Sequence, residues 1–151
     1  MIIDTHCHIY SSEMKNAEEI IKKAAEKDIS IILNGIDPLS NKEVLELSGK
    51  YENVYAALGY FYSFADEITD EDIFLLDNQL ENDNVVAVGE IGLDYYHTKD
   101  NKENQIELFE KMLCLAQKHN LPVIVHSRKS MQDTYDILKK HDVTGSMHCN
   151  R

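Results

Sequence analysis

The sequence predicts an α/β fold with a parallel sheet, of the (β/α)8-barrel type, and three observations lead to this prediction. Short apolar runs alternate with amphipathic segments along the whole chain, an alternation typical of a parallel sheet. No glycine-rich phosphate loop follows the first apolar run, which argues against a doubly wound nucleotide-binding fold. Residues able to bind a metal fall at the ends of the apolar runs, as expected where the strands of a barrel meet at one mouth.

The first half of the chain contains three expected strand–helix units. Residues 29–34 form a continuous run rich in β-branched side chains, which is typical of a strand covered on both faces. Two of the helices are expected to begin at capping boxes, formed by Asn16 with Glu19 and by Ser40 with Glu43. In chain order, the expected elements are a strand over 2–8, a helix over 16–27, a strand over 29–34, a helix over 40–50, a strand over 53–58 and a helix over 69–80.

The second half continues the same alternation. Its longest expected helix has Ile106, Phe109 and Leu113 on one apolar stripe, and Asn120 can close that helix in a left-handed turn. No linker interrupts the pattern, so about six βα units form a single domain over residues 1–151. The expected elements are a strand over 84–91, a helix over 102–119, a strand over 121–126, a helix over 130–140 and a strand over 144–148.

The composition is that of a globular protein with a strongly acidic surface. Of the 151 residues, 43 % are hydrophobic and 28 % are charged, and the formal net charge is −12. An acidic chain repels nucleic acid through its overall field, so the composition gives no electrostatic footprint for DNA binding. A phosphate-bearing substrate would therefore have to be attracted locally, by metal ions and a few basic side chains.

The cysteines and the apolar runs indicate the cellular compartment in which the protein is expected. The first residues lack the basic and then apolar pattern of a signal peptide, and no apolar run approaches the ~20 residues of a membrane span. Cys7, Cys114 and Cys149 are odd in number and have no CxxC spacing, which is typical of reduced thiols. We therefore expect a cytoplasmic protein that makes no contact with a membrane.

Residues able to bind metal lie at the carboxyl ends of four expected strands, and they are His6, His8, Glu90, His126 and His148. Side chains alternate across a strand, so the two histidines of the first strand point the same way. Five ligands suit two ions, with the first-strand pair on one ion, the other two histidines on the second, and Glu90 placing one oxygen on each. Two such ions stabilise the attacking and leaving oxygens of a displacement and lower the pKa of bound water. We therefore expect two divalent ions (Mg²⁺, Mn²⁺ or Zn²⁺) in a centre suited to phosphodiester hydrolysis.

Four segments resemble the TatD family of metal-dependent deoxyribonucleases, in the same order along the chain: IDTHCH, VGEIGLDYY, KENQIELFEKMLCLAQKHNLPVIVHSR and MHC. The resemblance implies a TIM barrel and the hydrolysis of DNA. It also implies that the five residues named above are the metal ligands, with Glu90 as a catalytic residue. Glu90 stands where the binuclear amidohydrolases carry a carboxylated lysine, which separates the two families.

The chain departs from the family pattern at three places. A Gly-x-His-Pro stretch usually follows the third strand, whereas this chain has GYFYSF, in which Tyr60 and Phe61 are expected either to stack on bases or to pack in the core. The last histidine is followed by CNR instead of an aromatic and a Ser-Gly turn. Strands seven and eight, with an Asp that binds the first metal in relatives, have no counterpart here. We therefore expect an incomplete barrel with open edges, which associates with copies of itself or with a complementary chain.

Three residues near the expected mouth are candidates for contacting the substrate, and they are Arg128, Asp94 and Tyr60. Arg128, with Lys129 beside it, is expected either to bind phosphate at the rim of the fifth strand or to be a plain surface residue. Asp94 is expected either to order a ligand or to close a turn. His97 lies in an expected loop and is expected to be a surface residue.

Three functions fit these features. The first is a two-metal deoxyribonuclease that cleaves DNA. The second is the hydrolysis of a small ester or amide by the same metal centre, which the acidic surface would favour. The third is a non-catalytic subunit that keeps the fold and works by association, which the missing strands and the missing Asp would favour.

Overall fold

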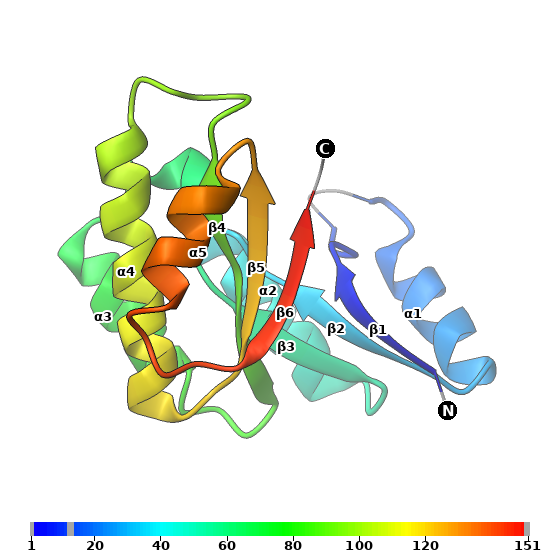
Figure 1. Cartoon of the computed structure of the whole chain (residues 1–151). Coiled ribbons are helices and arrows are strands. Elements are labelled where there is room, and N and C mark those ends of the chain that lie inside the picture. The colour runs from blue at the N-terminus through cyan, green and yellow to red at the C-terminus, as the bar shows by residue number, and fades with distance from the viewer. Residues whose placement is uncertain (1, 12–13, 150–151) are drawn as a thin grey trace.

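The computed structural model describes residues 2–11 and 14–149, in which strands and helices alternate along the chain (Figure 1). The elements are β1 (Ile2–Cys7), α1 (Ala17–Glu26), β2 (Ile29–Asn34), α2 (Pro38–Lys50), β3 (Val54–Leu58), the short 3-10 helix η1 (Tyr62–Phe64), α3 (Asp70–Gln79), β4 (Val85–Asp94), α4 (Lys102–His119), β5 (Val123–Arg128), α5 (Met131–Leu138) and β6 (Gly145–Cys149).

The six strands form one parallel sheet in the order β1-β2-β3-β4-β5-β6. Each strand therefore pairs with the next along the chain, without the reversal of strand order that defines a doubly wound sheet. The sheet is curled, and the helices lie along its outer side (Figure 1). This arrangement is a half-barrel of the TIM type, and it confirms the predicted fold class.

Several boundaries match the prediction, and one differs in a way that matters for the site. β2 and α4 begin and end at the predicted residues, and Asn120 closes α4 in the left-handed conformation with φ 53°. β4 was expected to end at Ile91 but continues through Asp94. The reason is tertiary, because residues 92–94 pair with residues 126–128 of β5.

The helix caps differ from the prediction. The Asn16 side chain makes no capping hydrogen bond at α1. α2 begins two residues earlier than expected, with Pro38 in its first turn, where the fixed φ of proline suits a helix. Its capping box is formed by Asp37, whose carboxylate accepts from the Ser40 N–H at 2.7 Å, and not by Ser40 with Glu43.

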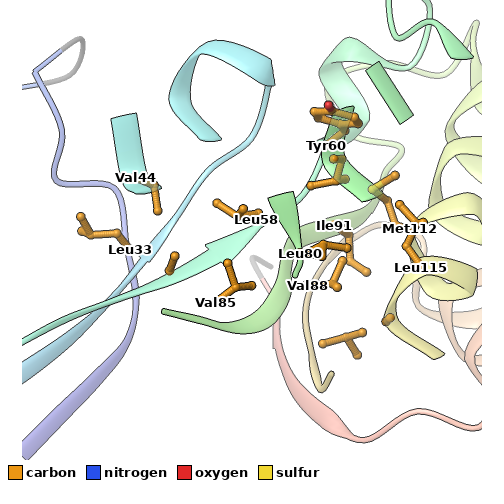
Figure 2. Close-up of a cluster of buried hydrophobic side chains, with 14 of the residues drawn as sticks. Leu33, Val44, Leu58, Tyr60, Leu80, Val85, Val88, Ile91, Met112 and Leu115 are labelled. Carbon is orange, nitrogen blue, oxygen red and sulfur yellow. The ribbon is translucent and has the colours of Figure 1, made fainter. Parts of the chain in front are cut away.

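The main core lies between the sheet and the helices outside it. Leu33 of β2 and Leu58 of β3 are fully buried in one cluster with Val44 of α2. Val88 of β4 and Met112 of α4 belong to the same cluster and are also 0 % exposed (Figure 2). Burial of this apolar surface orders the strands and so positions the side chains at their carboxyl ends.

The opposite face of the sheet carries a smaller cluster, made of Ala57, Ala87 and Ile124. These residues alternate along their strands with side chains that belong to the main core, as the twofold periodicity of a strand requires. β1 and β6 form the two edges of the sheet, where Ile2, Ile3 and Met147 are about half exposed or more, at 63 %, 50 % and 48 %. No helix in the described part of the chain combines the length and apolar character needed to cross a bilayer.

Candidate metal centre

Four imidazoles surround one buried carboxylate at the carboxyl ends of the strands. Glu90, from β4, is only 3 % exposed. Its Oε2 lies 3.1 Å from His8 Nε2 and 3.5 Å from His6 Nε2. Its Oε1 lies 3.4 Å from His126 Nδ1 and 2.5 Å from His148 Nε2. The structure therefore brings all five sequence-predicted ligands together, with two imidazoles on each oxygen of Glu90.

Shifts of register in two strand pairs help to orient the side chains of this cluster. The β4–β5 register shifts between Gly89 and Ile91, so that Glu90 is an extra residue in its strand. The β1–β2 register shifts between Asp4 and Cys7, a stretch that contains His6. Such bulges bend a strand locally and redirect a side chain, and they are common beside functional sites.

The two histidines of the HxH pair lie as the strand periodicity predicts, although β1 ends one residue earlier, at Cys7. The Nε2 atoms of His6 and His8 are 3.2 Å apart. The Cys7 thiol instead lies near the Ile32 carbonyl oxygen, with Sγ 3.6 Å away, and burial raises the pKa of that thiol to about 12. Cys7 is therefore a protonated thiol that stands apart from the imidazole cluster.

Hydrogen bonds from the outer nitrogens orient two of the imidazoles. His8 Nδ1 lies 2.9 Å from the Asn34 carbonyl oxygen, to which it donates, so Nε2 is the nitrogen that faces Glu90 and carries no proton in the neutral ring. His126 Nε2 lies 3.0 Å from Asp94 Oδ2, which leaves its Nδ1 on the Glu90 side. Contacts of this kind fix the ring orientation of metal-binding histidines.

The charge state of the cluster suits a cation. Burial alone would raise the pKa of the Glu90 carboxyl, but the four surrounding imidazoles outweigh burial and hold that pKa well below its usual range. Burial lowers the pKa of His6. Burial acts in the same direction on His126, but Glu90 and Asp94 together outweigh it and raise the pKa of His126. An ionised carboxylate ringed by imidazole nitrogens is a donor set typical of transition-metal sites.

Unpartnered atoms in the cluster agree with a role in metal binding. One ligand atom from each of His6, Glu90 and His148 lies within 4.8 Å of the others, a grouping that can hold a metal ion. Among the described residues, the buried His126 Nδ1 has no hydrogen-bond partner, although it faces Glu90. A buried ring nitrogen without a partner is costly unless it binds something. The residues present therefore fit a metal ion.

A cavity of about 340 Å³ opens over the imidazoles, and it is lined by His6, His8, Tyr10, Ile36, Phe61, Glu90, His126 and His148. The aromatic wall comes from the loop after β3. The Phe61 and Tyr62 rings have their centroids 5.1 Å and 5.5 Å from that of His126. Phe61 therefore forms part of the wall of the cavity over the imidazoles.

Tyr60 packs in the core and does not line the cavity. Its side chain is 1 % exposed and belongs to the main core, and its hydroxyl donates to the Asp72 carbonyl oxygen at 2.6 Å. Of the two alternatives left open by the sequence, packing is therefore the one that the structure shows. Phe61, the next residue along the chain, lines the cavity instead.

Asp94 lies beneath the site and does not reach the cavity. Its carboxylate is 0 % exposed and accepts four hydrogen bonds, from the N–H groups of Tyr96 and His97, from His97 Nδ1 and from His126 Nε2. The expectation that Asp94 binds substrate is therefore wrong in this structure, because no face of the carboxylate is open. Asp94 both orders a histidine and closes a turn.

Arg128 lies at the rim, where β5 ends. Its guanidinium carbon is 3.9 Å from the centroid of the Tyr96 ring, and its Nη1 lies 3.4 Å from His97 Nε2. His97 is exposed, as expected of a surface residue, and it also connects Asp94 to Arg128. The spacing in GLDYYH could have indicated this contact. An Asp three residues before a His can accept hydrogen bonds from the backbone and the imidazole of that His and so close the turn between them.

Comparison with known proteins agrees with this geometry. The TatD related DNase family profile matches residues 3–151. The chain is 36 % identical over 154 residues to YabD of Bacillus subtilis, described as an uncharacterized metal-dependent hydrolase, with 99 % of this chain and 60 % of YabD covered. It is also 36 % identical over 152 residues to YjjV of Escherichia coli K12, which has the same description, with 97 % and 59 % covered.

Solved structures of the family share the fold. The crystal structure of YjjV, a TatD homologue, matches with a TM-score of 0.86 and 35 % identity over 97 % of this chain and 59 % of that one. A TatD family hydrolase from Entamoeba histolytica matches with a TM-score of 0.81 and 25 % identity over 92 % and 54 %. The chain thus spans about three fifths of the length of the relatives it matches. By its sequence, its half-barrel and its imidazole–carboxylate cluster, this chain belongs to the TatD related DNase family.

Proposed function

We propose that the imidazole–carboxylate cluster is a two-metal hydrolytic centre that cleaves the phosphodiester bonds of DNA. The observation that carries the proposal is the position of the Glu90 carboxylate between two pairs of histidines. Each of its two oxygens faces two imidazole nitrogens within 3.5 Å. A carboxylate shared in this way is the arrangement expected of a bridge between two cations. The family match, which carries the term DNase in its description, supports phosphodiesters as the substrate class.

The residues divide into two groups of ligands. His6 and His8 would hold one ion, His126 and His148 the other, and Glu90 would bridge them and act as the catalytic carboxylate. Two divalent ions at such a site supply Lewis-acid activation of a phosphoryl oxygen and a more acidic water for in-line displacement. The buried, ionised Glu90 compensates the repulsion between two like charges held close together.

The donor set bears on which metal binds. Four imidazoles and one carboxylate suit Zn²⁺ and Mn²⁺, whereas Mg²⁺ prefers oxygen ligands and keeps much of its water. We therefore expect Zn²⁺ and Mn²⁺ to bind more tightly than Mg²⁺. Arg128, at the rim and held against Tyr96, would contact a substrate phosphate.

A second candidate function is the hydrolysis of a small ester or amide by the same centre. The observation that favours it is the formal net charge of −12, which repels a polyanion but not a small neutral ester. The cavity of about 340 Å³ over the imidazoles is within the size range of small-molecule sites, about 300–1,000 Å³.

A rate comparison tests these functions. The 151-residue chain would be loaded with Zn²⁺, Mn²⁺ or Mg²⁺, assayed for metal content by mass spectrometry, and offered single-stranded DNA and a panel of nitrophenyl esters, each with and without EDTA. We expect two ions per chain and DNA cleavage that EDTA abolishes. Ester turnover without DNA cleavage would favour the second function. Two bound ions without either activity would favour a non-catalytic role.

A further inference from the structure

A second cavity, of about 570 Å³, lies beside the metal centre and is lined by tyrosine rings and lysine amines. Its lining comes from the loop after β4, the first residue of α4 and the residue after β5. These residues are Tyr95, Tyr96, Lys99, Lys102 and Lys129, and we call this cavity the tyrosine–lysine pocket. It is larger than the cavity over the imidazoles, so it has room for a nucleotide-sized group.

The pocket gathers positive charge on a chain that is acidic overall. Lys102 is partly neutralised, because it pairs with Asp133 at 2.7 Å and lies 4.8 Å from the centroid of the Tyr95 ring. Lys99 and Lys129 are exposed and form no ion pair with any residue that the structure describes. Two amines are therefore left for an anionic ligand, and phosphate is the anion that a phosphodiester substrate brings.

The backbone at Lys129 is unusual for a lysine. Its φ is +56°, in the left-handed region that glycine, asparagine and aspartate adopt far more readily than lysine. A glycine would make this turn without strain. The position instead carries a long cationic side chain at the edge of the pocket.

Tyr96 offers the pocket an aromatic surface. Its side chain is 58 % exposed, and the Arg128 guanidinium lies 3.9 Å from the ring centroid. The ring is thus held in place by Arg128 and remains open to solvent over much of its area. Exposed aromatic rings of this kind are the platforms on which single-stranded nucleic acids stack their bases.

The pocket lies close to the metal centre, because residues of both follow one another along β4 and β5. His126 and Lys129 are three residues apart, so their Cα atoms lie at most about 11 Å from each other. On the neighbouring strand, Asp94 holds His126 and is followed two residues later by Tyr96. The two cavities are therefore close enough for one DNA strand to contact both.

We propose that the tyrosine–lysine pocket binds the nucleotides next to the cleaved phosphate of a single DNA strand, with Lys99 and Lys129 on phosphates and Tyr96 against a base. The proposal rests on the proposed function, because it specifies single-stranded DNA as the substrate of the metal centre. A single strand fits better than a duplex, since only an unstacked base can lie against a tyrosine ring.

Binding measured without cleavage tests the pocket. Fluorescence anisotropy with a labelled ten-nucleotide oligo-dT would be recorded in EDTA over a range of salt concentrations. We expect the double variant Lys99→Gln with Lys129→Gln to bind about tenfold more weakly than the unchanged chain. The slope of log K against log salt should fall by about 1.4, because each lost phosphate contact on a single strand removes about 0.7.

Two further variants separate charge from stacking. The double variant Lys139→Gln with Lys140→Gln removes the same charge at the opposite end of α5, where both lysines are exposed, and should bind as the unchanged chain does. Tyr96→Leu should weaken binding several-fold without changing the salt slope. Equal losses in the two lysine variants would overturn the proposal, because the effect would then come from net charge alone.

Failure of the pocket proposal can be distinguished from failure of the proposed deoxyribonuclease function. If the unchanged chain cleaves DNA and the Lys99/Lys129 variant binds the oligonucleotide as well as the Lys139/Lys140 variant does, the pocket proposal is overturned and the deoxyribonuclease stands. If the unchanged chain cleaves no DNA with any of the three metals, but binding depends on the pocket lysines and Tyr96, the deoxyribonuclease fails and the pocket stands as a binding site for single-stranded DNA.

Discussion

Asp94 accepts four hydrogen bonds and so links the metal centre to the loop that follows β4. One of its oxygens faces both His126 Nε2 and His97 Nδ1, and the other holds the two backbone N–H groups of the turn. A carboxylate in this position fixes the ring of a metal-binding histidine and the tautomer that it adopts. At the scale of single residues, the imidazole cluster therefore depends on a buried carboxylate that does not line the cavity.

The acid stability of the metal-free chain should report on Asp94. Burial raises the pKa of this carboxyl, but the hydrogen bonds from His97, His126 and Tyr96 outweigh burial and lower the pKa to about 2. Because the folded-state pKa lies below the usual value of about 3.9, the stabilisation is fully present above about pH 5 and is lost as the pH falls toward 2. We expect Asp94→Asn to lower the free energy of unfolding by roughly 2 kcal/mol at pH 7.

Urea denaturation in EDTA at pH 7, 5 and 3 measures this difference. The gap between the unchanged chain and Asp94→Asn should narrow toward pH 3. Asp83→Asn, a change at an exposed carboxylate, is the matched control and should leave the free energy of unfolding nearly unchanged at every pH. A gap for Asp94→Asn that stays constant down to pH 3 would show that the carboxylate's charge is not what stabilises the fold.

Glu90→Gln should harm metal binding more than Arg128→Ala does. The neutral amide leaves the repulsion between two ions uncompensated, whereas Arg128 lies at the rim and contacts Tyr96 and His97. Calorimetric titration with Mn²⁺ should show a lost or much weaker site in the first variant and unchanged stoichiometry in the second. Equal stoichiometry and affinity in both variants would refute the bridging role of Glu90.

At the scale of elements, the site depends on how two strands depart from regularity. β4 runs three residues past its predicted end and contains an extra residue at Glu90. Periodicity could place Glu90 near the end of this strand, but the bulge and the extension arise from pairing with β5. The sequence could therefore indicate Glu90 as a candidate site residue, but it could not show that β4 extends to Asp94.

Gly92→Ala should be strongly destabilising. Gly92 has φ +131°, and a Cβ there would lie 2.0 Å from the His126 carbonyl oxygen, where β4 and β5 pair. The backbone strain costs about 1–3 kcal/mol, and the clash with a neighbouring strand adds to it. We expect a loss of about 3 kcal/mol or more in the free energy of unfolding, or failure to fold.

Gly49→Ala is the matched control at the level of the helix. Gly49 lies in α2, and a Cβ there meets nothing within 4 Å. Alanine in a helix interior is favoured over glycine by roughly 0.5–1 kcal/mol, so this variant should be more stable. Thermal unfolding of both variants measures the contrast, and a Gly92→Ala chain as stable as the unchanged one would contradict the described β4 geometry.

At the scale of the whole molecule, the sheet leaves two edges with exposed apolar side chains. Ile2 and Ile3 on β1 are 63 % and 50 % exposed, and Met147 on β6 is 48 % exposed. The His6 and His148 rings approach to 4.2 Å between centroids, so the two edge strands meet at the metal centre. In the described part of the sheet, no strand pairs with the free side of either edge.

Self-association of the 151-residue chain stays a prediction, and it follows from these edges. Burying apolar surface is worth about 25 cal/mol per Å², and unpaired strand edges template further pairing. We expect light scattering at micromolar concentration to give a mass above 17.4 kDa. Ile2→Lys should reduce association, whereas Phe74→Lys, at a 69 % exposed position on α3, should not. A monodisperse monomer that unfolds cooperatively would show the prediction to be wrong.

The sequence by itself determined the order of strands and helices, because hydrophobic periodicity is local and strict βα alternation leaves few topologies. It also determined which side chains gather at the mouth, since the carboxyl ends of parallel strands lie together. Tertiary structure alone decided that Tyr60 turns into the core, that Asp94 contacts His126, and that lysines from three segments line one pocket. These outcomes depend on strand pairing and loop packing between distant segments, which no local pattern records.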